Sequence, residues 1–321
     1  MDSQQEQTVR LIRPLIPVDA QERVERAVKQ WNATLRKHIR DLTGLRLNDQ
    51  DSNLSIPVRV VDGFSNDLGQ LINRYNDPVL WKLIVGQPKI GGLVAGAEYL
   101  LGFWQELQGW NKLPKKWQGS ERSLARSRDL GLFLQQLAIA EKVRKEIKGI
   151  TEDYLGAYFY GTECKIEIYW IAIAMIAAMA DVRIEDLTIV VLIHELAHGY
   201  SHLGKDIDGG EWATNGFWQS DKDVKEGLAQ FYTHSVTESL ATRMPGPRQA
   251  YEALLKMQGG PYLAHLKWLK EHPKRTGEIV RFTMVAARST GVVTHSDWLK
   301  QMRKSGSSLG KRKQESADLF Q

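Results

Sequence analysis

The spacing of apolar side chains predicts that most of this chain is helical. From Asp19 to about Leu42, and again from Ser120 to about Lys148, apolar residues recur every three or four positions, as on one face of an amphipathic helix. Glycine and proline residues interrupt this pattern across residues 63–118 and again at residues 245–247. Residues 1–18 contain two prolines, so we expect an irregular lead-in before the first helix.

Strands are predicted in three short segments. Residues 55–61 alternate in polarity, although Pro57 weakens the pattern, and residues 155–161 and 165–170 form two further β segments joined by a tight turn. The apolar segment that follows, residues 171–180, predicts a buried helix. These elements favour an α+β fold that is mostly helical and contains a small mixed or antiparallel sheet.

One face of the next predicted helix carries apolar residues first and histidines after them. Leu187, Val190 and Val191 lie on the same helical arc as His194 and His198. Because the residues on this arc are apolar for the two turns before the histidines, we expect both imidazoles to point toward the core.

Composition adds few constraints. The chain has 321 residues, of which 42% are apolar and 25% are charged, values typical of a soluble globular protein with one or two domains. The net charge is +5 and the isoelectric point is about 9.1. Part of the basic excess lies near the end of the chain, at Lys300, Arg303, Lys304, Lys311, Arg312 and Lys313. This tail permits weak nucleic-acid contact, although a solvated surface is the simpler interpretation.

The single cysteine and the absence of a long apolar segment indicate the compartment. Cys164 cannot form a disulfide within the chain, which fits a reducing environment, and it is either a small core residue or a metal ligand. The first residues do not resemble a secretory signal, and the apolar run 168–180 is too short to span a bilayer. We therefore expect a cytoplasmic protein with no membrane contact.

The histidine face contains the motif H-E-x-x-H. His198 follows His194 by four positions, which places the two side chains about 40° apart around a helix, so both can reach one metal ion. Glu195 projects from the flank of this pair, close enough to act on a water molecule bound to the metal. The motif predicts metal-assisted hydrolysis, in which zinc activates water and Glu195 transfers its proton.

A catalytic zinc site requires a third protein ligand and one open position. The candidates downstream of the motif are His202, Asp206, Asp208, Glu211 and Glu226. We favour Glu226, at the start of a predicted helix in which the small residues Gly227 and Ala229 permit close approach to the motif helix. Gln230, one turn later, lies on the same face and could accept a hydrogen bond from a ligand histidine.

The combination H-E-L-A-H at 194–198 and E-G-L-A at 226–229 resembles the zincin metallopeptidases of the gluzincin type. The resemblance covers residues 150–245 and implies that His194, His198 and Glu226 bind Zn²⁺, with Glu195 as the base. It also implies a zincin-like core in which the sheet packs on the motif helix and its edge strand binds a peptide in extended form.

The chain departs from the gluzincin pattern at two points. Many gluzincins have an aspartate four residues after the glutamate ligand, where this chain has Gln230. The residue that stabilises the transition state in the family, a tyrosine, histidine or arginine, has no clear counterpart. Tyr200, Tyr232 and His234 are the candidates.

The leading interpretation is a zinc metallopeptidase acting on a protein or peptide substrate. Its predicted parts are a mainly helical N-terminal region (1–118), a catalytic domain (119–300) and a basic, disordered tail (301–321). One alternative is a zincin-like binding or assembly protein, associated with nucleic acid through its tail. Another is a deaminase or amide hydrolase acting on a small molecule. The sequence carries no indication of oligomeric state.

Overall fold

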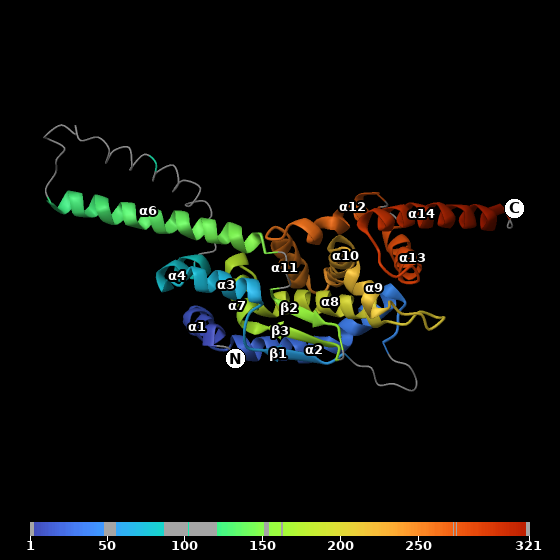
Figure 1. Cartoon of the computed structure of the whole chain (residues 1–321), viewed down its shortest axis with the longest axis horizontal. Coiled ribbons are helices and arrows are strands. Elements are labelled where there is room, and N and C mark those ends of the chain that lie inside the picture. The colour runs from blue at the N-terminus through green and yellow to red at the C-terminus, as the bar shows by residue number, and fades with distance from the viewer. Residues whose placement is uncertain are drawn as a thin grey trace.

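The computed structural model describes residues 3–47, 56–86, 102, 121–150, 154–161, 163–271, 273 and 275–318. It is an α+β structure in which helices account for 72% of the residues and three strands form one mixed sheet (Figure 1). The remaining part of the glycine- and proline-interrupted segment, residues 87–101 and 103–118, lies outside the described residues.

The described residues up to Ala180 form helices, one short 3-10 turn and the three strands of the sheet. In chain order these elements are α1 (Ser3–Ile12), η1 (Arg13–Leu15), α2 (Ala20–Thr43), β1 (Val58–Val61), α3 (Asn66–Arg74), α4 (Pro78–Gly86) and α6 (Glu121–Lys148), followed by the remaining strands β2 (Gly156–Phe159) and β3 (Lys165–Tyr169), with the apolar helix α7 (Trp170–Ala180) directly after them.

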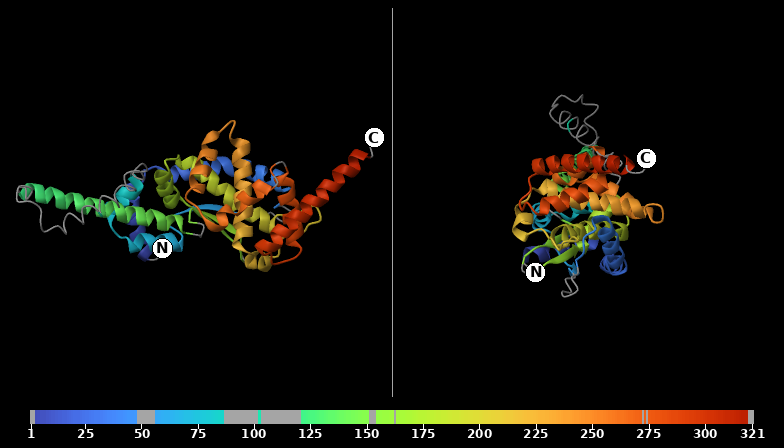
Figure 2. Two further views of the ribbon diagram at one scale, coloured as in Figure 1. Left: turned by 90° about the horizontal axis from the view of Figure 1, so that it is seen from above. Right: turned by 90° about the vertical axis from the view of Figure 1, so that its right-hand side faces the viewer.

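After Ala180 the named elements of the described residues are all helices, joined by loops. They are α8 (Ile184–Leu203), α9 (Thr214–Gln219), α10 (Lys222–Leu240), α11 (Pro245–Leu255), η4 (Gly260–Leu263), α12 (Ala264–Glu271), α13 (Thr276–Arg288) and α14 (His295–Asp318). Helices α6 and α14 extend from opposite ends of the molecule (Figure 2). None of the described helices is both long enough and apolar enough to cross a membrane.

Helix α8, which carries the H-E-x-x-H motif, is the central element of the core. It packs against α2, α7, α10 and α11 and contacts strands β2 and β3. Every residue from Asp186 to His202 is buried. The apolar arc identified in the sequence is therefore only one side of a helix that is covered all round, which explains why Leu192, Ile193 and Leu196 are also apolar.

The sheet has the strand order β1-β3-β2, so β2 lies at one edge. Strand β1 pairs with β3 in parallel, with Val60 opposite Ile168, and β2 pairs with β3 in antiparallel fashion, with Tyr158 opposite Ile166. Residues from the N-terminal region thus complete the same sheet that adjoins the motif helix.

A glycine permits β2 to lie directly against α8. A Cβ atom at Gly156 would come within 3.0 Å of the Val191 side chain and 3.1 Å of the Glu195 side chain. These separations are shorter than ordinary carbon–carbon contacts. Gly156 therefore brings the edge strand to the motif residue Glu195.

Three segments differ from the sequence prediction. The predicted irregular lead-in contains helix α1, because its prolines fall only at the 3-10 turn η1 and after it. The break predicted at residues 245–247 lies just before them, between α10 and α11, and Pro245 begins α11, where the missing N–H of proline carries no cost. Where a disordered tail is predicted, residues 301–318 continue helix α14.

An ion pair fixes the start of the motif helix to α2. The Arg23 guanidinium donates two hydrogen bonds to the Glu185 carboxylate, at 2.7 and 2.8 Å. These bonds lower the pKa of Glu185 from its ordinary value of 4.5 to about 2, against the opposing effect of burial. A carboxyl group with a lowered pKa stabilises the fold above its unfolded pKa, and this contribution disappears as the pH falls toward the folded pKa.

We therefore expect Glu185→Gln to reduce the free energy of unfolding by about 1–2 kcal/mol at neutral pH, less than the full pKa shift implies because water screens this partly exposed pair. Urea titrations should show the difference from wild type shrinking between pH 4.5 and pH 2. Glu22→Gln, at an exposed glutamate in the first turn of α2, is the matched control and should change stability by less than about 0.5 kcal/mol. A pH-independent difference for Glu185→Gln would contradict the assignment.

Candidate metal centre

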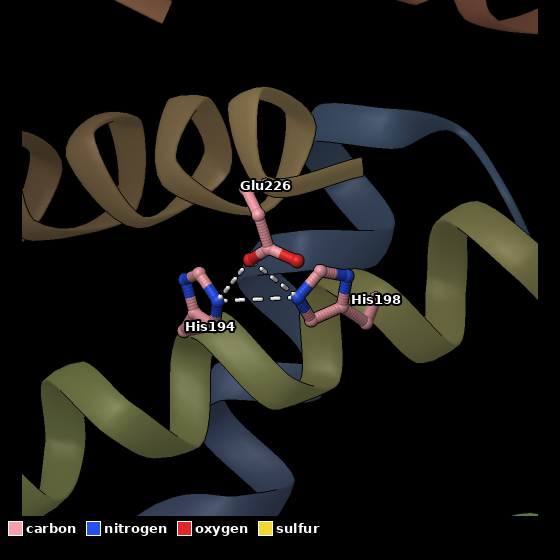
Figure 3. Close-up of side chains that lie close together, drawn as sticks. All are labelled: His194, His198 and Glu226. Atoms are coloured by element: carbon pink, nitrogen blue, oxygen red, sulfur yellow. Dashed lines mark hydrogen bonds and ion pairs between the residues drawn. The ribbon is translucent and has the colours of Figure 1, made fainter. Parts of the chain in front are cut away.

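Two helices bring three potential metal ligands to one point. His194 and His198 project from successive turns of α8, and Glu226 projects from the second turn of α10, which packs against α8. Figure 3 shows the Glu226 carboxylate between the two imidazole rings. The sequence separates Glu226 from the histidines by about 30 residues, and α9 and its flanking loops span that interval.

The spacing of the three ligand atoms fits a tetrahedral metal site. Glu226 Oε2 lies 3.2 Å from His194 Nε2 and 3.3 Å from His198 Nε2, and the two Nε2 atoms are 3.1 Å apart. A tetrahedral zinc ion with bonds of about 2.0–2.1 Å separates its ligand atoms by about 3.3–3.4 Å. The three side chains could therefore hold a metal ion with almost no rearrangement.

The cluster is shielded from water. His194, His198 and Glu226 are 7%, 5% and 8% exposed. Burial alone would raise the pKa of Glu226, but the charge of His198 and hydrogen bonds from both histidines outweigh burial and hold that pKa below its ordinary value. Glu226 is thus an ionised carboxylate inside the protein, a group that requires a cationic partner.

Glu195 lies beside the cluster and faces a small cavity. Its side chain is 1% exposed, and the cavity is lined by both Glu195 and His194, together with Gly156 of the edge strand. A second and larger cavity adjoins His198 and Glu226 on the other side, and the rest of β2 forms part of its wall. The three ligands therefore stand between two cavities that share one strand.

The other ligand candidates from the sequence lie outside this cluster. His202 uses both ring nitrogens elsewhere: Nδ1 is 2.8 Å from the Tyr158 hydroxyl, and Nε2 is 3.1 Å from the Thr214 hydroxyl. Burial lowers the pKa of His202 to about 4, so its ring is neutral near pH 7. Asp206 accepts hydrogen bonds from the backbone of its own loop, and that loop also carries the exposed residues Asp208 and Glu211.

The structure corrects the candidates for transition-state stabilisation. Tyr232 points away from the cluster, with its hydroxyl 3.9 Å from the sulfur of Met284 on α13, because it lies on the opposite side of α10 from Glu226. His234 packs against the rings of Tyr251 and His265 and does not line either cavity.

Tyr200 lies two residues beyond His198, on the other side of α8. Its side chain lines a separate cavity beside α2, where Arg36 is one of its neighbours. It therefore belongs to the packing between α8 and α2 and is not part of the ligand cluster.

Two further expectations about α10 require correction. Gly227 does not face α8, as the sequence suggested. A Cβ atom at this position would come within 2.5 Å of the Trp268 ring, so the glycine allows α12 to pack closely against α10. Gln230 lines the small cavity with His194, but its amide donates to the Gln258 side chain at 3.0 Å and makes no bond to a ligand histidine. Cys164, half-buried beside β3, is not part of the ligand cluster.

Tyr262 lies beside the cluster, in the wall of the small cavity. Its ring centre is 6.0 Å from that of His194, and its side chain lines the small cavity together with Glu195. The backbone carbonyl of Tyr262 lies 3.0 Å from Nδ1 of His265, whose other nitrogen contacts the Tyr251 hydroxyl at 2.7 Å. These buried contacts fix the η4 turn. The sequence contains no motif at Tyr262, so only its place in the fold reveals it.

No family model, curated protein or solved structure matches this chain. The assignment of a metal centre therefore rests on the geometry and burial of His194, His198 and Glu226.

We expect His198→Ala and Glu226→Ala each to weaken zinc binding by at least about 100-fold, because the loss of a direct ligand exceeds the effect of losing an outer-shell partner. Titration calorimetry and elemental analysis of dialysed protein provide the measurements. Glu226→Gln preserves the side-chain volume if the alanine variant does not fold.

The matched controls are Glu238→Ala, at an exposed glutamate on the same helix, and His38→Ala on α2. Both should bind zinc as tightly as wild type. Wild-type affinity in a folded Glu226→Ala variant would remove Glu226 from the ligand set.

Proposed function

We propose that this protein is a zinc-dependent metallopeptidase that hydrolyses peptide bonds in a protein or peptide substrate. The observation that carries the proposal is the buried His194–His198–Glu226 set, spaced as tetrahedral ligands, with Glu195 in the adjoining cavity. Two imidazoles and one carboxylate form the ligand set of zinc sites that keep their fourth position open for catalysis.

Zinc bound here would supply a Lewis acid that polarises the scissile carbonyl and lowers the pKa of a water molecule. Glu195 follows His194 directly on α8, so its carboxylate can take a proton from that water and return it to the leaving amine. Because Glu195 and all three ligands are buried, charges that develop during the reaction interact more strongly here than they would in bulk water.

The edge strand supports a peptide as the substrate. Among the described strands, β2 pairs with β3 alone, and residues 154–160 between them line the two cavities beside the candidate ligands. An extended peptide can form backbone hydrogen bonds with such an edge, which would hold one peptide bond over the metal. A small-molecule hydrolase has no need of an open strand at this position.

Tyr262 is suited to stabilise the oxyanion that forms on the scissile carbonyl. It lies on the same side of His194 as the small cavity, and the fixed η4 turn restricts its backbone. A phenol hydroxyl placed in advance can donate a hydrogen bond to the developing negative charge without reorganisation.

Glu195→Gln should retain zinc and reduce kcat by at least about 100-fold, because the amide has the same shape but cannot accept the proton. Zinc content and the cleavage of fluorogenic peptides are measured on the same preparation. Glu211→Gln, at an exposed glutamate outside the cluster, should match wild type in both assays. Unchanged turnover in Glu195→Gln would refute the mechanism.

Tyr262→Phe should reduce kcat by about 100–1,000-fold with little change in KM, since the lost hydrogen bond forms mainly in the transition state. Tyr232→Phe is the matched control: its hydroxyl faces Met284, so activity should stay within about twofold of wild type. A larger loss in Tyr232→Phe than in Tyr262→Phe would reverse the two assignments.

A further inference from the structure

The two cavities beside the ligand cluster differ greatly in size. The cavity that contains Glu195 has a volume of about 30 Å³, and the cavity that adjoins His198 and Glu226 has a volume of about 330 Å³. Strand β2 connects them: Gly156 borders the small cavity, and Ala157 to Phe159 border the large one. A peptide aligned with β2 would place residues on the two sides of its scissile bond into these two spaces.

The small cavity has room for little more than a methyl group. A water molecule needs about 10–15 Å³ of such space, so about 30 Å³ corresponds to one or two small groups. The walls include Val190, Val191 and Leu254, whose side chains belong to the core and are at most 5% exposed. Because these three side chains are packed from behind, the cavity cannot enlarge on their side without disturbing helices α8 and α11.

The large cavity has an aromatic and basic lining. Tyr158, Phe159 and Tyr160 of the β2 segment line it with Tyr169 and Phe217. Lys222 and Lys225 also line it, and among the described residues of its wall the candidate ligand Glu226 is the one carboxylate. The Lys225 ammonium donates to the Trp218 carbonyl at 2.8 Å and lies 5.7 Å from the Phe217 ring centre. Aromatic side chains fit such a wall, and two lysines repel a basic side chain.

The position of Glu195 sets the direction of the substrate. Glu195 must pass its proton to the leaving amine, which belongs to the residue that follows the scissile bond. Because Glu195 lines the small cavity, that residue occupies the small cavity, and the residue before the bond occupies the large one. β2 runs from the small cavity to the large one, so the substrate lies antiparallel to the strand, the same arrangement in which β2 pairs with β3.

We propose that the protein cleaves peptides between a large aromatic residue and a following glycine, alanine or serine, and excludes lysine and arginine before the cleaved bond. This inference rests on the proposed peptidase function and adds its specificity. The balance of the reaction is that of hydrolysis: the C–N bond breaks, water supplies the hydroxyl of the new carboxylate, and a proton passes to the amine.

The test is digestion of a mixed-sequence peptide library by zinc-loaded wild-type protein, with cleavage sites identified by mass spectrometry. Aromatic residues before the cleaved bond and small residues after it should each be enriched at least about tenfold over leucine at the same position. Leucine, phenylalanine or arginine enriched after the bond would overturn the assignment of the small cavity. Lysine or arginine enriched before the bond would overturn the assignment of the large one.

Two variants with matched controls test the walls. Leu254→Ala should increase cleavage before valine and leucine at least about tenfold relative to alanine, whereas Leu255→Ala, on the same helix but outside the cavity, should not. Val190→Ala serves the same purpose if Leu254→Ala does not fold.

Phe159→Ala should reduce the aromatic preference, and Phe282→Ala, at a similarly exposed phenylalanine on α13, should leave it unchanged. Unaltered profiles in all the cavity variants would overturn the inference.

The library experiment distinguishes an error in the proposed specificity from an error in the proposed peptidase function. Zinc-loaded protein that cleaves no peptide in the library contradicts the proposed function, and the specificity falls with it. Cleavage without the expected residue pattern leaves the peptidase function intact and overturns the specificity alone.

Discussion

Burial of an ionised carboxylate beside two imidazoles is the constraint on which the rest of the structure depends. Glu226 is 8% exposed and holds a negative charge, so the protein must provide a cation or a hydrogen-bond donor at that point. The imidazoles of His194 and His198 face it at 3.2 and 3.3 Å, and Lys225 lines the same cavity. Two imidazoles and one carboxylate are also a ligand set that suits a divalent metal ion, and such an ion would supply the cation at this point.

The side chains of His194, His198 and Glu226 meet only if α8 and α10 keep a fixed position relative to each other. A shift of one residue along α10 would rotate the carboxylate by about 100° and remove it from the histidines. The surrounding core prevents such a shift. Helix α8 is enclosed by four helices and the sheet, and α10 is held from its far side by Trp268, which fits against Gly227. The relative positions of the three candidate ligands are therefore determined by packing between other residues of the core.

The sequence predicts the parts of the site that local periodicity determines. His194, Glu195 and His198 share one helix, so their relative positions follow from its 3.6-residue repeat, and Glu226 is identifiable as an acidic residue near the start of the next predicted helix, although Gly227 does not have the packing role expected of it. The same reasoning fails where tertiary packing decides. Tyr232 and Tyr262 are both tyrosines in helical segments, and only the direction of α10 and the η4 turn separates them. Pro245 likewise begins a helix because α11 has a place against α8, which the sequence does not reveal.

The ion pair between Arg23 and Glu185 has a consequence for the order in which the molecule is made. The two residues are 162 positions apart, and α2 is the longest partner of the motif helix. At synthesis rates of about 5–20 residues per second, Arg23 is added to the chain roughly 8–32 seconds before Glu185. During that interval the apolar face of α2 has no native surface to cover. Helix α8 can therefore pack against α2 only after more than half of the chain has been synthesised, and the three candidate ligands can meet only once α10 has followed.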